Sequence, residues 1–188
     1  MKYLNNFTFG FFFLFLFALG SCGEGSNKTP EKLPYFDLKG FMEIQAKNLD
    51  SSNVILISRV QGKEVRKEAT ISTFEWMQEF DTFIQADINK QSLLLSYDTQ
   101  VKNNVLTHSL FPDSKGKLKE MKVTYIDDKV VSVTLKMSEE NLFYKSTTFA
   151  DLYMNNATQK VDHYSIETTQ KIWFLDPSNI KIMGAIRP

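Results

Sequence analysis

The sequence has few of the residues from which disulfides, metal centres and nucleophilic sites are built. Among 188 residues there is one cysteine, Cys22, and there are two histidines, His108 and His163. A single cysteine excludes an intramolecular disulfide. The histidines are far apart in the sequence, and neither a His-x-x-x-His pattern nor a cysteine pair typical of a zinc site is present.

Motifs for nucleophilic catalysis and for phosphate binding are also missing. The sequence contains no Gly-x-Ser-x-Gly elbow, and its glycines form no phosphate-binding loop between a strand and a helix. Two acidic pairs, Asp127-Asp128 and Glu139-Glu140, fall in predicted turns, where neighbouring carboxylates point apart into solvent. We therefore expect a protein that is not an enzyme, with no metal and no cofactor.

The sequence also has no excess of positive or of negative charge. Lysine plus arginine and aspartate plus glutamate each number 22, so the formal net charge at pH 7 is zero. This balance gives no reason to expect nucleic acid as a partner, because proteins that bind it carry clustered basic side chains. The most apolar stretch, Phe7 to Leu19, would be ~20 Å long as a helix, whereas a membrane span needs about 20 residues or ~30 Å.

The N-terminus does contain a pattern typical of a secretory signal peptide. Lys2 precedes the phenylalanine-rich stretch, which ends at Leu19-Gly20-Ser21-Cys22. These four residues resemble the lipobox of bacterial lipoproteins. The resemblance implies cleavage before Cys22 by signal peptidase II, diacylation of the Cys22 thiol and acylation of the new amino terminus. The alternative, a transmembrane anchor, is disfavoured by the short length of the apolar stretch.

The same resemblance predicts where the protein resides and how it is divided. Two or three acyl chains suffice for stable membrane attachment. Gly23 stands where an aspartate would resemble an inner-membrane retention signal, which favours the outer membrane, on its periplasmic face or at the cell surface. We predict residues 1–21 as signal peptide, residues 22–34 as lipidated cysteine and flexible tether, and residues 35–188 as a single domain.

Two stretches have the apolar spacing of helices. The first begins after Asp37, a suitable N-cap, and runs to about Leu49. The second begins at Ser72, three residues before Glu75, which is the spacing of a capping box, and ends before Asn89. Its apolar stripe predicts a core face, with a ligand wall or a docking surface as the alternative. The stripe consists of Trp76, Met77, Phe80, Phe83 and Ile84.

The rest of the chain has the alternation of β-strands. Residues 54–57 predict a buried strand, which turns at Gln61-Gly62 into a partner strand over residues 64–70. After the second helix we expect strands only, with turns at Asn103-Asn104, Asp127-Asp128-Lys129 and Glu139-Glu140-Asn141. These strands cover residues 92–100, 105–111, 121–125, 131–137, 142–154, 159–175 and 180–186. Runs longer than ten residues suggest a strongly curved sheet or bulges.

This order of elements predicts an α+β fold: a curved, half-barrel-like antiparallel β-meander with two helices packed on one face. The architecture is similar to the half-barrels of bacterial lipoprotein and lipid carriers of the LolA/LolB type. The lipid anchor and the long meander suggest an apolar concave face that holds a lipid, with Trp76 and Phe80 as candidate ligand contacts.

Three lysines are candidates for the rim of such a cavity. Lys115, Lys117 and Lys119 share the parity of Met121 and Val123. If the strand extends back to them, their ammonium groups lie at the edge of the apolar face, where they would hold an anionic headgroup. In the alternative interpretation they belong to a solvated loop, and their parity has no meaning.

The sequence leaves two functions open. The first is a membrane-anchored envelope lipoprotein that binds a lipid or other apolar ligand, through Trp76, Phe80 and the three lysines. The second is a non-enzymatic interaction lipoprotein that docks an envelope protein partner through a sheet edge or a loop. In both, the acylated Cys22 attaches the chain to the membrane.

Overall fold

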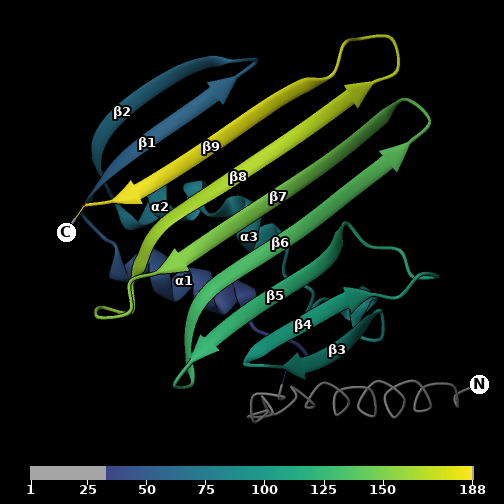
Figure 1. Ribbon diagram of the computed structural model, residues 1–188, viewed down its shortest axis with the longest axis horizontal. Helices are drawn as coiled ribbons and strands as arrows, with labels where there is room; N and C mark the ends of the chain where they lie inside the picture. Colours follow the sequence, from purple (N-terminus) through teal and green to yellow (C-terminus); the bar gives the residue numbers. More distant parts are fainter. Residues whose placement is uncertain (1–32, 188) are drawn as a thin grey trace, which may run out of the picture. The chain divides into compact units, whose positions relative to one another are not determined.

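The computed structural model describes residues 33–187, which fold as an antiparallel sheet with a small helical layer (Figure 1). The predicted signal peptide, Cys22 and nearly all of the predicted tether lie outside these residues. The strands are β1 (Ser52–Val60), β2 (Lys63–Ile71), β3 (Tyr97–Lys102), β4 (Val105–Leu110), β5 (Leu118–Ile126), β6 (Lys129–Asn141), β7 (Tyr144–Met154), β8 (Val161–Ile172) and β9 (Ser178–Ile186). The helices are α1 (Leu38–Asn48), α2 (Thr73–Glu79), α3 (Asp81–Gln85) and the 3₁₀ turn η1 (Gln91–Leu93). The α+β class is confirmed.

All nine strands belong to one antiparallel sheet, in the order β2-β1-β9-β8-β7-β6-β5-β4-β3. The strands from β3 to β9 form the predicted meander, each pairing with the next along the chain. The β1–β2 hairpin adds to the far side of β9, with Val54 opposite Ile186. The segment that contains α2 and α3 therefore connects one edge of the sheet, β2, to the other edge, β3.

The hairpin turns are formed by residues that tolerate left-handed backbone angles. Asn103 and Asn104 connect β3 to β4, and Asp127 and Asp128 connect β5 to β6, all four with positive φ. Two-residue hairpin loops with both residues at positive φ match the twist of the flanking strands, and asparagine and aspartate tolerate these angles best. The two predicted turns are confirmed.

Helix α1 begins where its cap predicts. The Asp37 side chain accepts a hydrogen bond from the Gly40 amide at 2.9 Å and so satisfies one of the free N–H groups of the first turn. Leu38 and Met42 on this helix and Leu49 at its C-cap are fully buried, and α1 packs against α2 and α3. The predicted first helix is therefore confirmed.

The second predicted helix begins with the expected capping box but is broken in the middle. Ser72 and Glu75 form both hydrogen bonds of the box. At Phe80 the backbone leaves the helix, with φ −88° and ψ 5°, and a second short helix follows. The prediction of one continuous helix was wrong; Phe80, at the break, and Phe83, after it, are both fully buried.

Two strand boundaries differ from the sequence prediction. Residues 92–96 are not strand, because this segment folds over Tyr35, whose hydroxyl hydrogen-bonds the Leu94 carbonyl at 2.7 Å. Glu139-Glu140-Asn141 is not a turn but the end of β6, where Glu140 pairs with Lys145 across the hairpin. The turn lies at residues 142–143, which the sequence analysis had placed in a strand.

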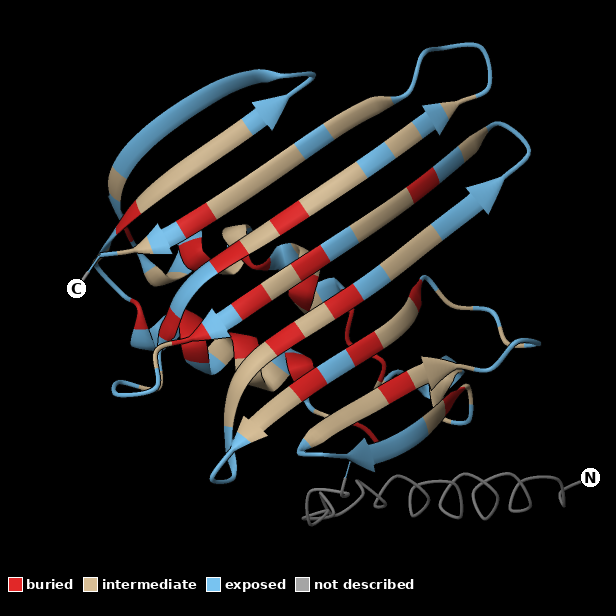
Figure 2. Cartoon of the chain, viewed as in Figure 1, coloured by how far each residue is buried: buried red, intermediate tan, exposed pale blue. Residues whose placement is uncertain are grey.

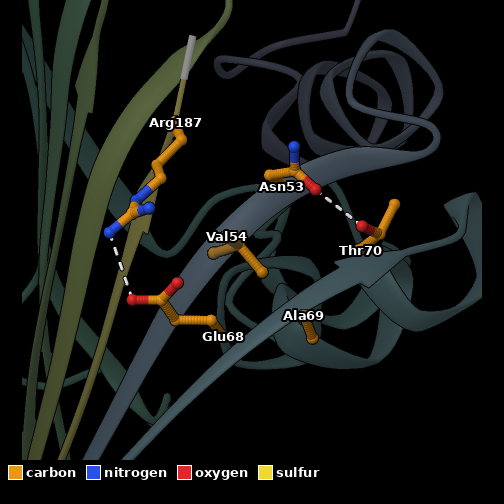
Figure 3. Close-up of a pocket in the computed structure, with 6 residues that line it drawn as sticks. All are labelled: Asn53, Val54, Glu68, Ala69, Thr70 and Arg187. Carbon is orange, nitrogen blue, oxygen red and sulfur yellow. Dashed lines mark hydrogen bonds and ion pairs between the residues drawn. The ribbon is translucent and has the colours of Figure 1, made fainter.

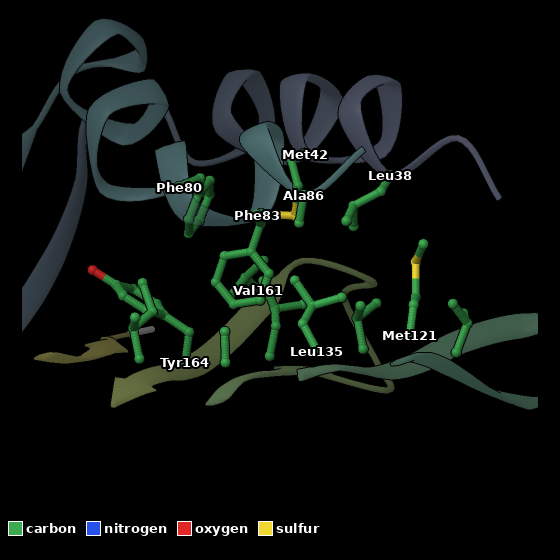
Figure 4. Close-up of a cluster of buried hydrophobic side chains, with 14 of the residues drawn as sticks. Leu38, Met42, Phe80, Phe83, Ala86, Met121, Leu135, Val161 and Tyr164 are labelled. Atoms are coloured by element: carbon green, nitrogen blue, oxygen red, sulfur yellow. The ribbon is translucent and has the colours of Figure 1, made fainter. Parts of the chain in front are cut away.

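The core lies between the helices and one half of the sheet (Figure 4). Figure 2 shows that the buried segments of the strands gather at the end near the helices, while the opposite ends of β6 to β9 are mostly half-buried or exposed. Of the predicted buried strand over residues 54–57, only Val54 is fully buried. Its other residues are half-buried, which corrects that prediction.

One glycine allows a large side chain to enter this core. Gly184 on β9 lies directly opposite Tyr164 on β8, and a Cβ at position 184 would collide with the Tyr164 ring. A glycine within a strand often marks such a close approach. Tyr164 is 1% exposed, and its hydroxyl donates a hydrogen bond to Glu79 at 2.7 Å, so it connects the sheet to α2.

Candidate functional site

The structure places Trp76 and Phe80, two candidate ligand contacts, in the interior of the protein. Both side chains are 0% exposed, and their rings stack with centroids 5.2 Å apart. The Trp76 indole N–H donates to the Leu49 carbonyl at 2.8 Å, and Phe80 meets the Tyr164 ring edge-on. These contacts fill the space between helices and sheet, and neither residue lines a pocket described below.

The three candidate rim lysines are not equivalent in the structure. The pairing of β5 with β6 is irregular between Leu118 and Glu120, so the alternation of residues 121–125 does not continue back to the lysines. As a result Leu118, and neither of the lysines beside it, is buried, with 3% of its surface exposed. Lys119 donates to the Gly116 carbonyl, and Lys117 pairs with Glu139 at 2.9 Å. Lys115 is exposed and lines none of the pockets described here.

Lys117 nevertheless lies at a pocket, at the junction between the segment after α3 and strands β3, β5 and β6. We call this cavity of about 270 Å³ the Tyr97 pocket. Its lining is mainly apolar, with Lys90, Lys117, Asp87 and Gln85 as the polar members. The apolar members are Ala86, Ile88, Leu93, Tyr97, Leu118 and Met137. A mainly apolar lining with a few polar groups is typical of small-molecule sites, and the volume is close to the lower end of their usual range of about 300–1,000 Å³.

The phenol of Tyr97 is held in place at this pocket. Its hydroxyl donates to the Leu118 carbonyl at 2.8 Å, and burial raises its pKa to about 12. The group therefore stays protonated at physiological pH, so it offers an uncharged wall and no base. Lys90 at the rim donates to the Gln85 carbonyl at 3.0 Å, which orders the loop over the pocket.

A second, more polar cavity adjoins the Tyr97 pocket and shares Lys117 and Met137 with it. It measures about 250 Å³ and lies over strands β6 to β8. Hydroxyl groups are frequent in its lining, and those of Thr148 and Thr168 hydrogen-bond each other at 2.9 Å. We call it the Thr148 pocket. The two cavities together give an apolar end and a polar end on either side of the same lysine.

Two further cavities lie near Arg187. Figure 3 shows the first, of about 390 Å³, in which Arg187 pairs with Glu68 at 3.1 Å and Thr70 donates to Asn53 at 2.6 Å. The second, of about 330 Å³, lies between Leu49 and the turn after β7. The polar groups of the first are already satisfied by one another. This leaves no unpaired charge there to attract a ligand.

His108, on β4, is 1% exposed. Its Nε2 accepts a hydrogen bond from the Phe36 amide at 3.2 Å, so the neutral ring carries its proton on Nδ1, which donates to the Thr99 hydroxyl at 2.8 Å. Burial lowers the pKa of His108. The residue connects β4 to the segment that enters α1, which is a structural role.

Residues 33–187 offer no assembled metal site: no group of three or more histidine, cysteine, aspartate or glutamate side chains in them is placed to hold an ion. None of the helices in this range is long and apolar enough to cross a membrane. His163, the other histidine, is exposed and pairs with Asp162 at 2.7 Å.

The structure also shows a surface that the sequence analysis did not identify. The turn between β6 and β7 and the loop between β8 and β9 lie next to each other at one end of the sheet (Figure 1). Both carry large apolar side chains that are mostly in solvent. We call this set the hairpin tips: Leu142 (89% exposed), Phe143 (59%), Trp173 (72%), Phe174 (79%) and Leu175 (51%). These residues fall within the predicted strands over residues 142–154 and 159–175, and in the second of these Phe174 shares the parity of Ile166 and Ile172.

Comparison with family models, with curated proteins and with solved structures finds no match for this chain.

Proposed function

We propose that the protein is a membrane-anchored envelope lipoprotein that binds a small amphiphile in the Tyr97 pocket. The observation that supports this most directly is the apolar lining of that pocket with Lys90 and Lys117 beside it. An apolar chain gains about 25 cal/mol per Å² when it leaves water, and ammonium groups favour an anionic headgroup at the opening. Neither ligand binding nor membrane anchoring requires a catalysed reaction, so the proposed role is non-enzymatic.

The Thr148 pocket gives this ligand a polar end. Because it shares Lys117 with the Tyr97 pocket, a headgroup near Lys117 lies within reach of the hydroxyls of Thr148 and Thr168. An anionic headgroup can therefore accept a hydrogen bond from these hydroxyls as well as pair with Lys117. The predicted curvature of the sheet belongs to this proposal, since bending toward the helices would enclose the ligand.

The proposal also covers the anchor at Cys22. A protein held at a membrane by acyl chains meets amphiphiles at high local concentration. The mass of the protein purified from membranes tests this part by itself: we expect a chain that starts at Cys22 and carries two or three acyl groups. A chain without acyl mass would remove the anchor from the proposal and leave the pocket standing.

Docking to an envelope protein remains the second candidate, and the structure favours a loop over a sheet edge for it. The edge strand β2 carries Lys63, Glu64, Arg66, Lys67 and Glu68. Charged side chains along an edge strand hinder its pairing with another chain. The hairpin tips, which carry large apolar side chains, are the more suitable contact surface.

The ligand proposal is tested by native mass spectrometry and by binding of decanoate, in competition with the fluorescent anionic amphiphile anilinonaphthalene sulfonate. Leu93→Trp fills the Tyr97 pocket and should abolish decanoate binding. Leu95→Trp is the matched control, because Leu95 is 91% exposed, is not part of the lining, and lies two residues further on. Lys90→Ala with Lys117→Ala should weaken decanoate binding without affecting decanol.

Each result has a clear meaning. Loss of binding in the Leu93 variant with full binding in the Leu95 variant supports the pocket as the site. Equal binding by both variants, or a wild-type protein that binds neither probe and leaves membranes without a bound small molecule, contradicts the proposal. Thermal unfolding of all variants shows that the comparison is made on folded protein.

A further inference from the structure

The hairpin tips form one continuous apolar surface across two hairpins. Tyr144, the first residue of β7, lies opposite Ile172, the last residue of β8, so the turn before Tyr144 and the loop after Ile172 are side by side. The Trp173 amide donates to the Phe143 carbonyl at 3.0 Å, and the two rings lie with centroids 6.2 Å apart. The surface is therefore held in a defined arrangement by the sheet below it.

Several backbone groups at the tips have partners within the chain. Asn141 accepts from the Phe143 amide at 2.9 Å, and the Ile172 carbonyl accepts from the Leu175 amide at 3.1 Å. The Leu175 carbonyl accepts from the Lys171 ammonium at 2.8 Å. A segment that enters the apolar part of a bilayer must satisfy its backbone groups internally, because lipid tails offer no hydrogen bonds.

Charge around the tips is balanced. The charged residues that flank them in the sequence are Glu140, Lys145, Lys171 and Asp176, two of each sign. Glu140 and Lys145 pair with each other at 3.1 Å. An apolar surface of this kind is suited to the interface of a zwitterionic bilayer, where tryptophan is enriched and attraction does not depend on anionic lipid.

We propose that the hairpin tips insert into the interface of a lipid bilayer and fix the orientation of the domain on the membrane. A protein partner is less well matched, because the backbone groups noted above are already occupied and the flanking charges compensate one another. The proposal concerns a different site from the Tyr97 pocket and does not depend on ligand binding there.

The length of the preceding chain permits this contact on the same membrane that would hold Cys22. Tyr35, near the start of the described chain, contacts Tyr97 on β3. The registers from β3 to β7 place Tyr97 at the same height in the sheet as Thr148 on β7. Thr148 is five residues from Phe143. Four strand spacings and five residues of rise give about 26 Å between Tyr97 and Phe143. Residues 22 to 35 span at most about 45 Å when extended.

The natural tryptophans make the test direct. The chain has two: Trp76 is 0% exposed and Trp173 is 72% exposed. The full-length protein purified from membranes is reconstituted into phosphatidylcholine vesicles with brominated acyl chains, which quench tryptophan at bilayer depth. We expect the emission of Trp173, taken as the difference between wild type and Trp173→Phe, to be mostly lost. Added salt or anionic lipid should leave this loss unchanged.

Variants identify the surface responsible. Leu142→Ser with Phe143→Ser should restore most of the Trp173 emission. Leu95→Ser is the matched control, since Leu95 is as exposed as Leu142 but lies outside the tips, and it should leave the quenching intact. Equal thermal unfolding midpoints confirm that the variants are folded.

Two results would overturn the proposal. In the first, brominated lipid has no effect on Trp173 while acrylamide in the water quenches it strongly, which places the tips in solvent. In the second, Trp173 is protected from both quenchers and the protein has the mass of a dimer, which means that a second copy covers the tips.

Discussion

The backbone amide of Phe36 donates a hydrogen bond to Nε2 of His108, 72 residues further along the chain, at 3.2 Å. This contact requires a neutral imidazole, and burial lowers the pKa of His108 to favour that form. Phe36 precedes α1, so the hydrogen bond connects the start of the domain to β4.

The first prediction concerns acid. The pKa of His108 is lower in the folded state than in the unfolded state, so the unfolded chain takes up its proton first as the pH falls. The stability from this group is complete above about pH 6.5, the usual pKa of histidine, and is lost as the pH falls toward the folded-state pKa. Urea unfolding at pH 7 and pH 5 measures the loss.

Substitution of His108 tests that assignment. His108→Phe should cost about 1–3 kcal/mol at pH 7, because it leaves the Phe36 amide without its acceptor. The remaining stability should vary less between pH 7 and pH 5 than in the wild type. His163→Gln, at an exposed position, should keep the wild-type acid response; if it removes that response, His108 is not the group responsible.

The second prediction concerns Gly184 and the ring of Tyr164. Gly184→Ala should destabilise the protein by about 1–3 kcal/mol, because the new Cβ collides with a ring in a packed core. Urea unfolding measures the change. In a double-mutant cycle, Tyr164→Leu should remove most of the cost of Gly184→Ala. Strict additivity of the two substitutions would show that the collision is not its cause.

The third prediction concerns the cap of α2. Ser72→Ala should cost about 1 kcal/mol at pH 7, the usual value of an N-cap hydroxyl. Because the Ser72 amide and hydroxyl both donate to the Glu75 carboxylate, they lower its pKa. The substitution should therefore raise the pKa of Glu75, which NMR titration measures directly. An unchanged titration would mean that the amide alone sets this pKa.

The fourth prediction separates binding from stability at Lys117. Its ion pair with Glu139 is exposed, with 73% and 45% of the two side chains in solvent, so Lys117→Ala should change unfolding by no more than ~1 kcal/mol. Decanoate binding should nevertheless weaken. Lys115→Ala provides the control, because Lys115 is not part of the Tyr97 pocket. Equal weakening by both variants would indicate a general charge effect.

The elements set by neighbouring residues could be predicted from the sequence. The caps at Asp37 and Ser72, the turns at Asn103-Asn104 and Asp127-Asp128, and the alternation from Met121 to Val123 depend on contacts a few residues apart. Each of them was confirmed.

The features that depend on residues distant in the sequence could not be predicted. Phe80, where the helix breaks, packs against the distant Tyr164, and the buried His108 hydrogen-bonds Phe36 and Thr99. For the candidate site, the irregular pairing after Leu118 changes which lysine faces a pocket, and no alternation pattern reveals it. The exposure of Trp173 and Phe174 depends on β8 ending at Ile172, whereas the apolar parity continues past that residue.

The position of β9 has a consequence for how the chain folds. β1 comes early in the sequence, but its second neighbour in the sheet is β9, which comes last among the described strands. Val54 can therefore pair with Ile186 only after β9 has been made. Pairing at such sequence separation gives a high contact order, and folding should be slow compared with that of helical domains of this size. Until β9 arrives, both β1 and β8 present an open edge, which favours aggregation. Completion of the sheet is therefore delayed until β9 has been synthesised.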